Sequence, residues 1–175
     1  MEWQQLMVDG CGRVLEILEP AFEGLTPEDL DWQPHPECNS MGWITWHLTR
    51  GQDSQIASLM GKKQLWIVDR WHDKFERPAD PKDTGFGHTP EQVVAFKSPD
   101  PDVLLDYYRA VLEQTKGYLG TLSLADLDKE LNEPRYKPPP TVGVRLVSIM
   151  ADCLEHAGEV GYLRGLMKGK GWLDA

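Results

Sequence analysis

The sequence lacks both a long hydrophobic run and an excess of basic residues. No apolar segment reaches the ~18–20 residues that span a bilayer, and residues 1–5 have neither the basic head nor the apolar core of a signal peptide. The chain has 18 Lys and Arg residues against 28 Asp and Glu, which gives a formal net charge of −10. Because nucleic acids and anionic membranes repel such a charge, we expect neither as a partner.

Cysteine is also scarce. The three cysteines, Cys11, Cys38 and Cys153, form no Cys-x-x-Cys pair, and their odd number suits a reducing compartment. The sequence has no internal repeats, no low-complexity tract and no convincing strand pattern. A chain of 175 residues can bury one substantial core. We therefore expect a cytoplasmic protein with a single domain over residues 1–175.

Four long segments have the apolar spacing of helices. They cover residues 3–19, 40–60, 101–120 and 141–168. Pro20 is expected to end or kink the first helix, and Asn39 or Ser40 to cap the second. Gly169 and Gly171 are stop signals for the last helix. The sequence thus predicts an all-α fold.

The connection over residues 61–97 is much longer than the two to eight residues usual between helices of a bundle. It holds a short aromatic segment, a Pro/Asp/Gly-rich stretch and a turn of helix after Thr89. Shorter helices are also expected to start at Thr26 and Ser123. Because so long a connection can return the chain to the other end, the second and third long helices can run parallel. We predict a four-helix bundle with a crossover between helices two and three.

The last predicted helix carries a stripe of ionisable residues. At about 100° per residue, Asp152, His156 and Glu159 fall on one face, and Arg145 lies two turns earlier on the same line. Most other directions around this helix are apolar, so most of its surface is expected to be buried. The simplest interpretation of the stripe is a solvent-exposed face, and the alternative is a binding site.

The second predicted helix carries His47. This residue shares a line with Gly51, Ser54 and Ser58, whose small side chains leave room for a neighbouring helix or a cavity. Polar residues, among them Asp53, lie on roughly the opposite side. We expect His47 to point inward, either towards a site or as a core histidine bonded to a backbone carbonyl.

Together these residues resemble the ligands of a metal ion. A carboxylate and an imidazole four residues apart on a helix, Asp152 and His156, can reach one ion, and His47 is the obvious third ligand. Three ligands drawn from His and Asp suit zinc or a related first-row divalent ion such as nickel. Such a set leaves a coordination position open for water or a thiol.

The sequence gives weaker support for the remaining candidate site residues. Arg145 suits the carboxylate of a substrate, or it is a surface arginine. Glu159 could orient a ligand histidine or carry a proton, or it is simply solvated. Cys153 lies a quarter turn from the stripe and is expected in the core. His72 and His88 lie in the crossover and are expected to be exposed.

Two motifs carry a family resemblance. Residues 39–47, which read Asn-Ser-Met-Gly-Trp-Ile-Thr-Trp-His, followed by Asp53, resemble the second helix of DinB-superfamily proteins. Residues 155–158, Glu-His-Ala-Gly, with residues 162–166, Tyr-Leu-Arg-Gly-Leu, resemble their last helix. The likeness covers residues 26–172 and is closest to the branch that includes mycothiol-dependent maleylpyruvate isomerases.

The resemblance implies a four-helix bundle with a divalent metal bound by His47, Asp152 and His156. Many members have histidine at the position of Asp152, while the isomerase branch is similar in using a carboxylate there. The implied activity is S-transfer or isomerisation of a small electrophilic substrate with mycothiol or a similar low-molecular-weight thiol. The alternative is a non-enzymatic metal-binding stress or structural protein, for which a homodimer is one arrangement.

Overall fold

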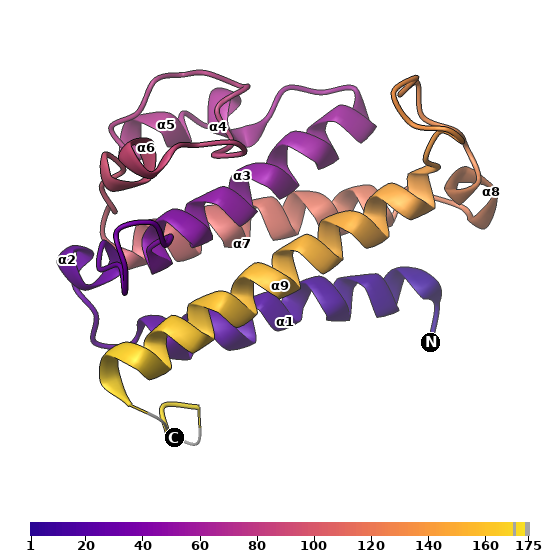
Figure 1. Cartoon of the computed structure of the whole chain (residues 1–175). Coiled ribbons are helices and arrows are strands. Elements are labelled where there is room, and N and C mark those ends of the chain that lie inside the picture. Colours follow the sequence, from indigo (N-terminus) through magenta and orange to yellow (C-terminus); the bar gives the residue numbers. More distant parts are fainter. Residues whose placement is uncertain (170, 174–175) are drawn as a thin grey trace.

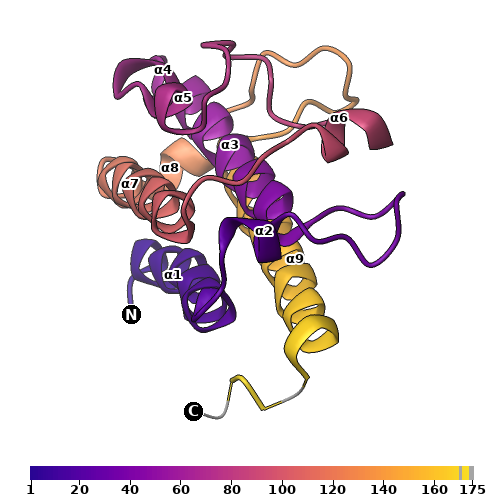
Figure 2. The same ribbon diagram turned by 90° about the vertical axis from the view of Figure 1, so that its left-hand side faces the viewer.

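Four long helices build the fold in the computed structural model, which describes residues 1–169 and 171–173. They are α1 (Trp3–Phe22), α3 (Met41–Met60), α7 (Pro101–Leu119) and α9 (Val142–Lys168). Both α1 and α3 pack against α7 and α9, so the four axes form the corners of a bundle (Figure 2). Within the described residues no strand forms, and the only β pairing is one isolated bridge between Glu130 and Thr141. The predicted fold class is confirmed.

The direction of each helix confirms the predicted crossover. Both α3 and α7 run from the end near α2 towards the end near α8, whereas α1 and α9 run the opposite way (Figure 1). The chain between α3 and α7 therefore returns along the whole bundle. It leaves α3 at Gly61, whose φ of 63° is in the left-handed region that glycine favours.

Short helices lie in the connections, and two of them begin with the capping side chains that the sequence suggested. Thr26 and Thr89 accept hydrogen bonds from the backbone N–H three residues on, each with proline at the first helical position. These elements are α2 (Pro27–Leu30), α4 (Leu65–Val68), α5 (Trp71–Lys74), α6 (Pro90–Val94) and α8 (Leu124–Leu127).

The first helix is longer than predicted. Pro20 was expected to end or kink it, but α1 continues through Pro20 to Phe22. Proline removes one backbone donor near the end of the helix. The last turn persists because it carries Ala21 and Phe22 into the core, where they are 0% and 3% exposed. Burial of these side chains outweighs the missing hydrogen bond.

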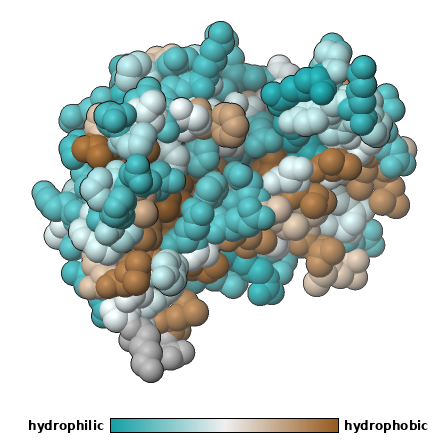
Figure 3. All heavy atoms as spheres, viewed as in Figure 1, coloured by the Kyte–Doolittle hydropathy of each residue, from teal (hydrophilic) through white to brown (hydrophobic). Residues whose placement is uncertain are grey.

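The surface alternates in character. In the view of Figure 3, groups of hydrophobic residues are separated by a mainly hydrophilic surface. Among the described helices, none combines the length and apolar character needed to cross a membrane.

Candidate metal centre

His47 lies in the middle of α3 and is half-buried. Its Nδ1 is hydrogen-bonded to the carbonyl oxygen of Thr84, and its ring stacks on Trp43 with centroids 4.9 Å apart. A carbonyl only accepts, so Nδ1 carries the proton and the neutral ring keeps its free lone pair on Nε2. Burial lowers the pKa of His47 and so favours this neutral form, while the Thr84 carbonyl acts in the opposite sense.

Gly85 allows the crossover to approach His47 this closely. A Cβ atom at this position would lie 2.9 Å from ring atoms of both Trp43 and Trp46, and 3.0 Å from Nδ1 of His47. The backbone also has φ of 86°, which L side chains rarely adopt. Only glycine therefore fits between the Thr84 carbonyl and the aromatic side chains of α3.

A buried charged network fastens this part of the crossover to α3. Arg50 and Asp53 are both 0% exposed, with 3.7 Å between guanidinium and carboxylate. Arg50 donates to the carbonyl of Asp83 at 3.1 Å, next to Thr84, and also to the carbonyls of residues 80 and 81. The residue that follows His47 by one turn thus holds the loop that supplies the acceptor for His47.

Asp53 completes the network. Its carboxylate accepts from the backbone N–H groups of Leu65 and Trp66, both at 2.9 Å, and from the hydroxyl of Tyr107 at 2.7 Å. Burial raises the pKa of Tyr107 well above its usual value, so the hydroxyl remains a donor. These bonds cap α4 and join α3 to α7.

On the other side of the site, α9 presents Asp152, His156 and Glu159 on one stripe, as predicted. Nδ1 of His156 lies 2.8 Å from Oε2 of Glu159, and its Nε2 lies 3.8 Å from Oδ1 of Asp152. The hydrogen bond to Glu159 is the main reason why the pKa of His156 is raised. A carboxylate acceptor at Nδ1 leaves the lone pair of a neutral His156 on Nε2, as for His47.

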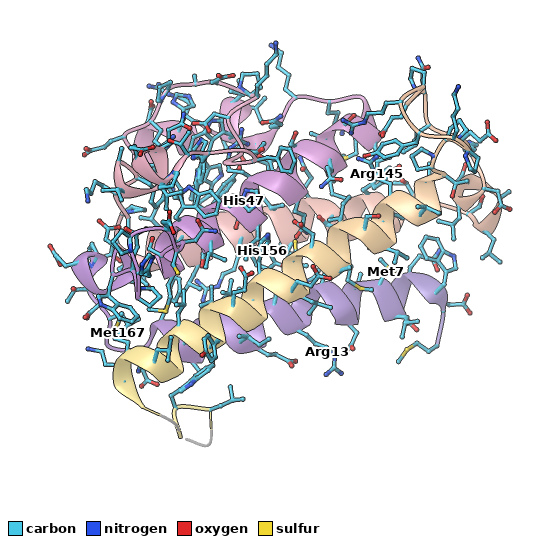
Figure 4. The ribbon with its side chains drawn as sticks, viewed as in Figure 1. Met7, Arg13, His47, Arg145, His156 and Met167 are labelled. Carbon is cyan, nitrogen blue, oxygen red and sulfur yellow. The ribbon has the colours of Figure 1, made fainter. Side chains whose placement is uncertain are left out.

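The two histidines meet across α3 and α9 (Figure 4). Their ring centroids are 5.1 Å apart and the rings are nearly perpendicular, at 75°. Asp152 faces Gly51, whose missing Cβ would lie 3.7 Å from the carboxylate. The structure therefore brings together His47, Asp152 and His156. However, no three His, Cys, Asp or Glu side chains within residues 1–169 and 171–173 are already arranged to hold a metal ion.

The donors nevertheless fit a divalent metal chemically. Histidine ligands of metals usually donate their second ring N–H to a carbonyl or carboxylate. Thr84 and Glu159 supply such acceptors here. The free Nε2 atoms and the nearby Asp152 make a His/His/Asp donor set suited to zinc or nickel. Because the three side chains are not yet arranged as ligands, binding would require them to move on two helices that are already in contact.

A cavity of about 790 Å³ opens beside these residues. Its floor comes from α3 and α9, including His47 and Asp152, and its walls come from the crossover and the loop before α9. The volume is within the range typical of small-molecule sites. The site therefore joins potential metal ligands to a space for a ligand.

Arg145 lines the far end of this cavity, nearer the N-terminal end of α9 than the two histidines (Figure 4). Its NH2 group lies 2.7 and 2.6 Å from the two carboxylate oxygens of Glu133, and its NH1 group donates to Gln55 at 3.1 Å. The charge predicted to hold a substrate carboxylate thus already has a carboxylate partner. Its role as an anion anchor stays a prediction and requires displacement of Glu133.

Other expectations have mixed outcomes. Cys153 is 2% exposed in the core, as predicted. The prediction that His72 and His88 are exposed is wrong, because their side chains are only 14% and 12% exposed. His88 lies 3.0 Å from Asp83 and accepts a hydrogen bond from the indole of Trp43. Trp43 is 45 residues from His88 in the sequence, and the composition of the crossover does not specify this pairing.

Sequence patterns missed the roles of Arg50 and Tyr107. They placed Asp53 on the side of α3 opposite His47 but did not reveal that this side is the more deeply buried. The signal available was Arg50 and Asp53, which are opposite charges three residues apart and the only Asp, Glu, Lys or Arg residues in positions 41–60. Such a pair inside a buried helix predicts a buried ion pair.

Comparison with known proteins agrees with this architecture. Residues 12–160 match the model of the DinB superfamily, and no curated protein matches the chain. A crystal structure of a conserved protein from Enterococcus faecalis has 31% sequence identity and a TM-score of 0.89. The similarity covers 97% of this chain and 99% of that one. With most of its length matched and its bundle reproduced in a solved relative, the chain belongs to the DinB superfamily.

Proposed function

We propose that the protein binds a divalent metal through His47, Asp152 and His156 and uses a low-molecular-weight thiol on a small electrophilic substrate. The observation that best supports metal binding is that both imidazoles are hydrogen-bonded through Nδ1. Each has Nδ1 committed to an acceptor, and the rings lie 5.1 Å apart. A second ring N–H bonded to a carbonyl or carboxylate is usual among histidines that bind metals, and both histidines have it here.

A bound metal would supply Lewis acidity and lower the pKa of a coordinated thiol. The residues of the chain provide the surroundings. Thr84 and Glu159 hold the protons on Nδ1 of the two histidines, and Glu159, with its side chain 53% exposed, can exchange a proton with solvent. The cavity of about 790 Å³ provides space for the thiol and the electrophile. In an addition reaction sulfur bonds to carbon and the thiol proton ends on the product.

Replacement of His156 with alanine tests the metal site. We expect His156→Ala and His47→Ala to lose bound zinc almost completely, because two remaining protein ligands rarely hold it. The metal content of purified protein, measured by elemental analysis, checks this. Lys74→Ala on the crossover is the control and should keep full metal content. Undiminished metal in His156→Ala would show that the ligands lie elsewhere.

The alternative is a non-enzymatic metal-binding protein, in which a homodimer remains one arrangement. It shares the metal site and differs only in chemistry. The rate of addition of 2-mercaptoethanol to a maleimide, with and without bound metal, distinguishes the two. Metal-dependent acceleration that His156→Ala abolishes supports the enzyme. Full metal loading without acceleration of this or other electrophiles supports the alternative.

A further inference from the structure

The cavity beside the candidate metal centre is lined by apolar side chains that the proposed metal chemistry does not explain. Phe86 lines it and is 90% exposed, and Tyr136 and Val144 line it with 46% and 54% exposure. Prolines 138–140 also line the cavity. Single exposed apolar residues are common, but several around one cavity are typical of a ligand site.

Phe86 is held at a fixed place relative to His47. It stands between Gly85 and Gly87, whose φ angles are 86° and 77°. Gly85 is wedged against Trp43 and His47, and the preceding Thr84 carbonyl is bonded to His47. The backbone is therefore anchored next to the ring, while the phenyl group remains in solvent.

In the loop before α9, Tyr136 lines the cavity, and the guanidinium of Arg135 lies 4.8 Å above its ring. The side chain of Arg135 is 73% exposed, and its closest carboxylate, that of Glu133, is 3.9 Å away. The floor from α3 and α9 carries small residues such as Gly51 and Ser148. Small floor residues leave the depth that a ring requires.

We propose that this cavity binds a small molecule with a flat apolar group, such as an aromatic ring, in contact with Phe86 and Tyr136. A donor group of the same molecule lies at the His47–Asp152 end, and this part rests on the proposed function. The volume of about 790 Å³ exceeds that of one ring and leaves space for such a donor. Because the apolar residues surround a cavity, a small molecule fits them better than the flat surface of a protein.

The first test needs no metal. Anilinonaphthalene sulfonate, an anionic probe with two aromatic parts, is titrated by fluorescence into metal-free protein. We expect saturable binding that Phe86→Ala weakens about five- to tenfold, because most of one aromatic contact is lost. Leu6→Ala, at a residue 61% exposed on α1 and outside the cavity, is the matched control and should bind as wild type. Unchanged melting curves confirm that both variants fold.

A second test places the ring relative to the metal. Acetohydroxamate and benzohydroxamate share one metal-binding group and differ by a phenyl ring. In zinc-loaded wild-type protein we expect benzohydroxamate to bind about tenfold more tightly, and in Phe86→Ala this advantage should fall to less than about threefold by the same scale.

The outcomes separate the two proposals. If neither hydroxamate binds but the fluorescent probe still depends on Phe86, the metal role fails and the aromatic site stands. If the probe binds Phe86→Ala as tightly as wild type, or does not saturate, the aromatic site is overturned whatever the metal does. An equal benzohydroxamate advantage in Phe86→Ala would also overturn it.

Discussion

The two halves of the candidate metal centre are built in different ways. The α3 half sets His47 beside a fully buried network, in which Arg50 and Asp53 are 0% exposed. The α9 half sets His156 among carboxylates that face solvent, with Asp152 and Glu159 side chains 45% and 53% exposed. The pKa of His47 is lowered mainly by burial, whereas that of His156 is raised mainly by its hydrogen bond to Glu159.

The two halves therefore have different roles: the α3 half orients its histidine, and the α9 half surrounds its histidine with negative charge. A histidine beside a rigid network keeps its orientation and stays neutral, which a metal ligand requires. A histidine beside exposed carboxylates can adjust its side chain and exchange protons with solvent. One half of the site therefore fixes the geometry, and the other supplies negative charge and contact with solvent.

The largest expected difference between the two halves is in how a substitution changes the free energy of unfolding. Asp53→Asn should lower the free energy of unfolding by about 3–5 kcal/mol, because it leaves Arg50 buried without its counter-charge. The NH2 group of the new asparagine would also face a backbone N–H group that now donates to the Asp53 carboxylate. Asp152→Asn is the matched control on α9 and should change stability by less than about 1 kcal/mol. Urea unfolding of both metal-free proteins measures this, and similar losses would remove the distinction between the halves.

Zinc binding should depend on pH, mainly through protonation of His156 in the α9 half of the site. At zinc concentrations about 100 times the Kd, we expect stabilisation of about 2.7 kcal/mol near pH 7. Near pH 5 the effect should be much smaller, because protons then compete for the ligands and His156 binds them more tightly than His47. Melting curves with and without zinc at both pH values measure it. Equal shifts would indicate ligands that do not titrate in this range.

Glu159 can be tested separately from the ligands. Glu159→Gln keeps a hydrogen-bond acceptor for Nδ1 of His156 but removes the charge, so we expect about tenfold weaker zinc binding. Isothermal titration calorimetry gives the affinity. Glu155→Gln, one turn earlier and exposed, is the control, and its affinity should stay within about twofold of wild type by the general tolerance of surface sites. Equal losses in both variants would indicate only a long-range effect of charge.

The smallest effect is the separation of the two histidine pKa values in metal-free protein. His47 should titrate below the ordinary value of 6.5 and His156 above it. The unfolded chain binds a proton more readily than folded His47, so stability from this residue falls as the pH drops below 6.5. His156 stabilises below that pH, and its contribution disappears as the pH rises through its raised pKa. NMR titration of the ring protons assigns each value, and a reversed order would contradict the burial argument.

Sequence patterns predicted most of the fold because local signals and tertiary packing agree. Ser40 and Thr141 cap α3 and α9 near the expected residues, and the length of the crossover implied parallel helices. The predicted end of the first helix at Pro20 is wrong, because α1 continues to Phe22, whose burial outweighs the local preference. Such a competition depends on which helix lies opposite, which periodicity does not contain.

The site was predictable only in part. Helical spacing put Asp152, His156 and Glu159 on one stripe and indicated an inward His47 as the third ligand, which the family resemblance also implied. The hydrogen-bond acceptor for His47 is the carbonyl of Thr84, 37 residues away. The carbonyls of Asp83 and Asp80, which accept from Arg50, are 30 or more residues from it. No local pattern specifies those pairings. They depend on how the crossover folds back over α3.

The carboxylate of Asp53 also has a consequence for the rate of local opening. It holds the amide groups of Leu65 and Trp66 at the first turn of a helix of only four residues. A helix this short would fray within microseconds in isolation. Here those two amides can reach solvent only when a fully buried carboxylate is exposed, so their hydrogens should exchange as slowly as those of the long helices.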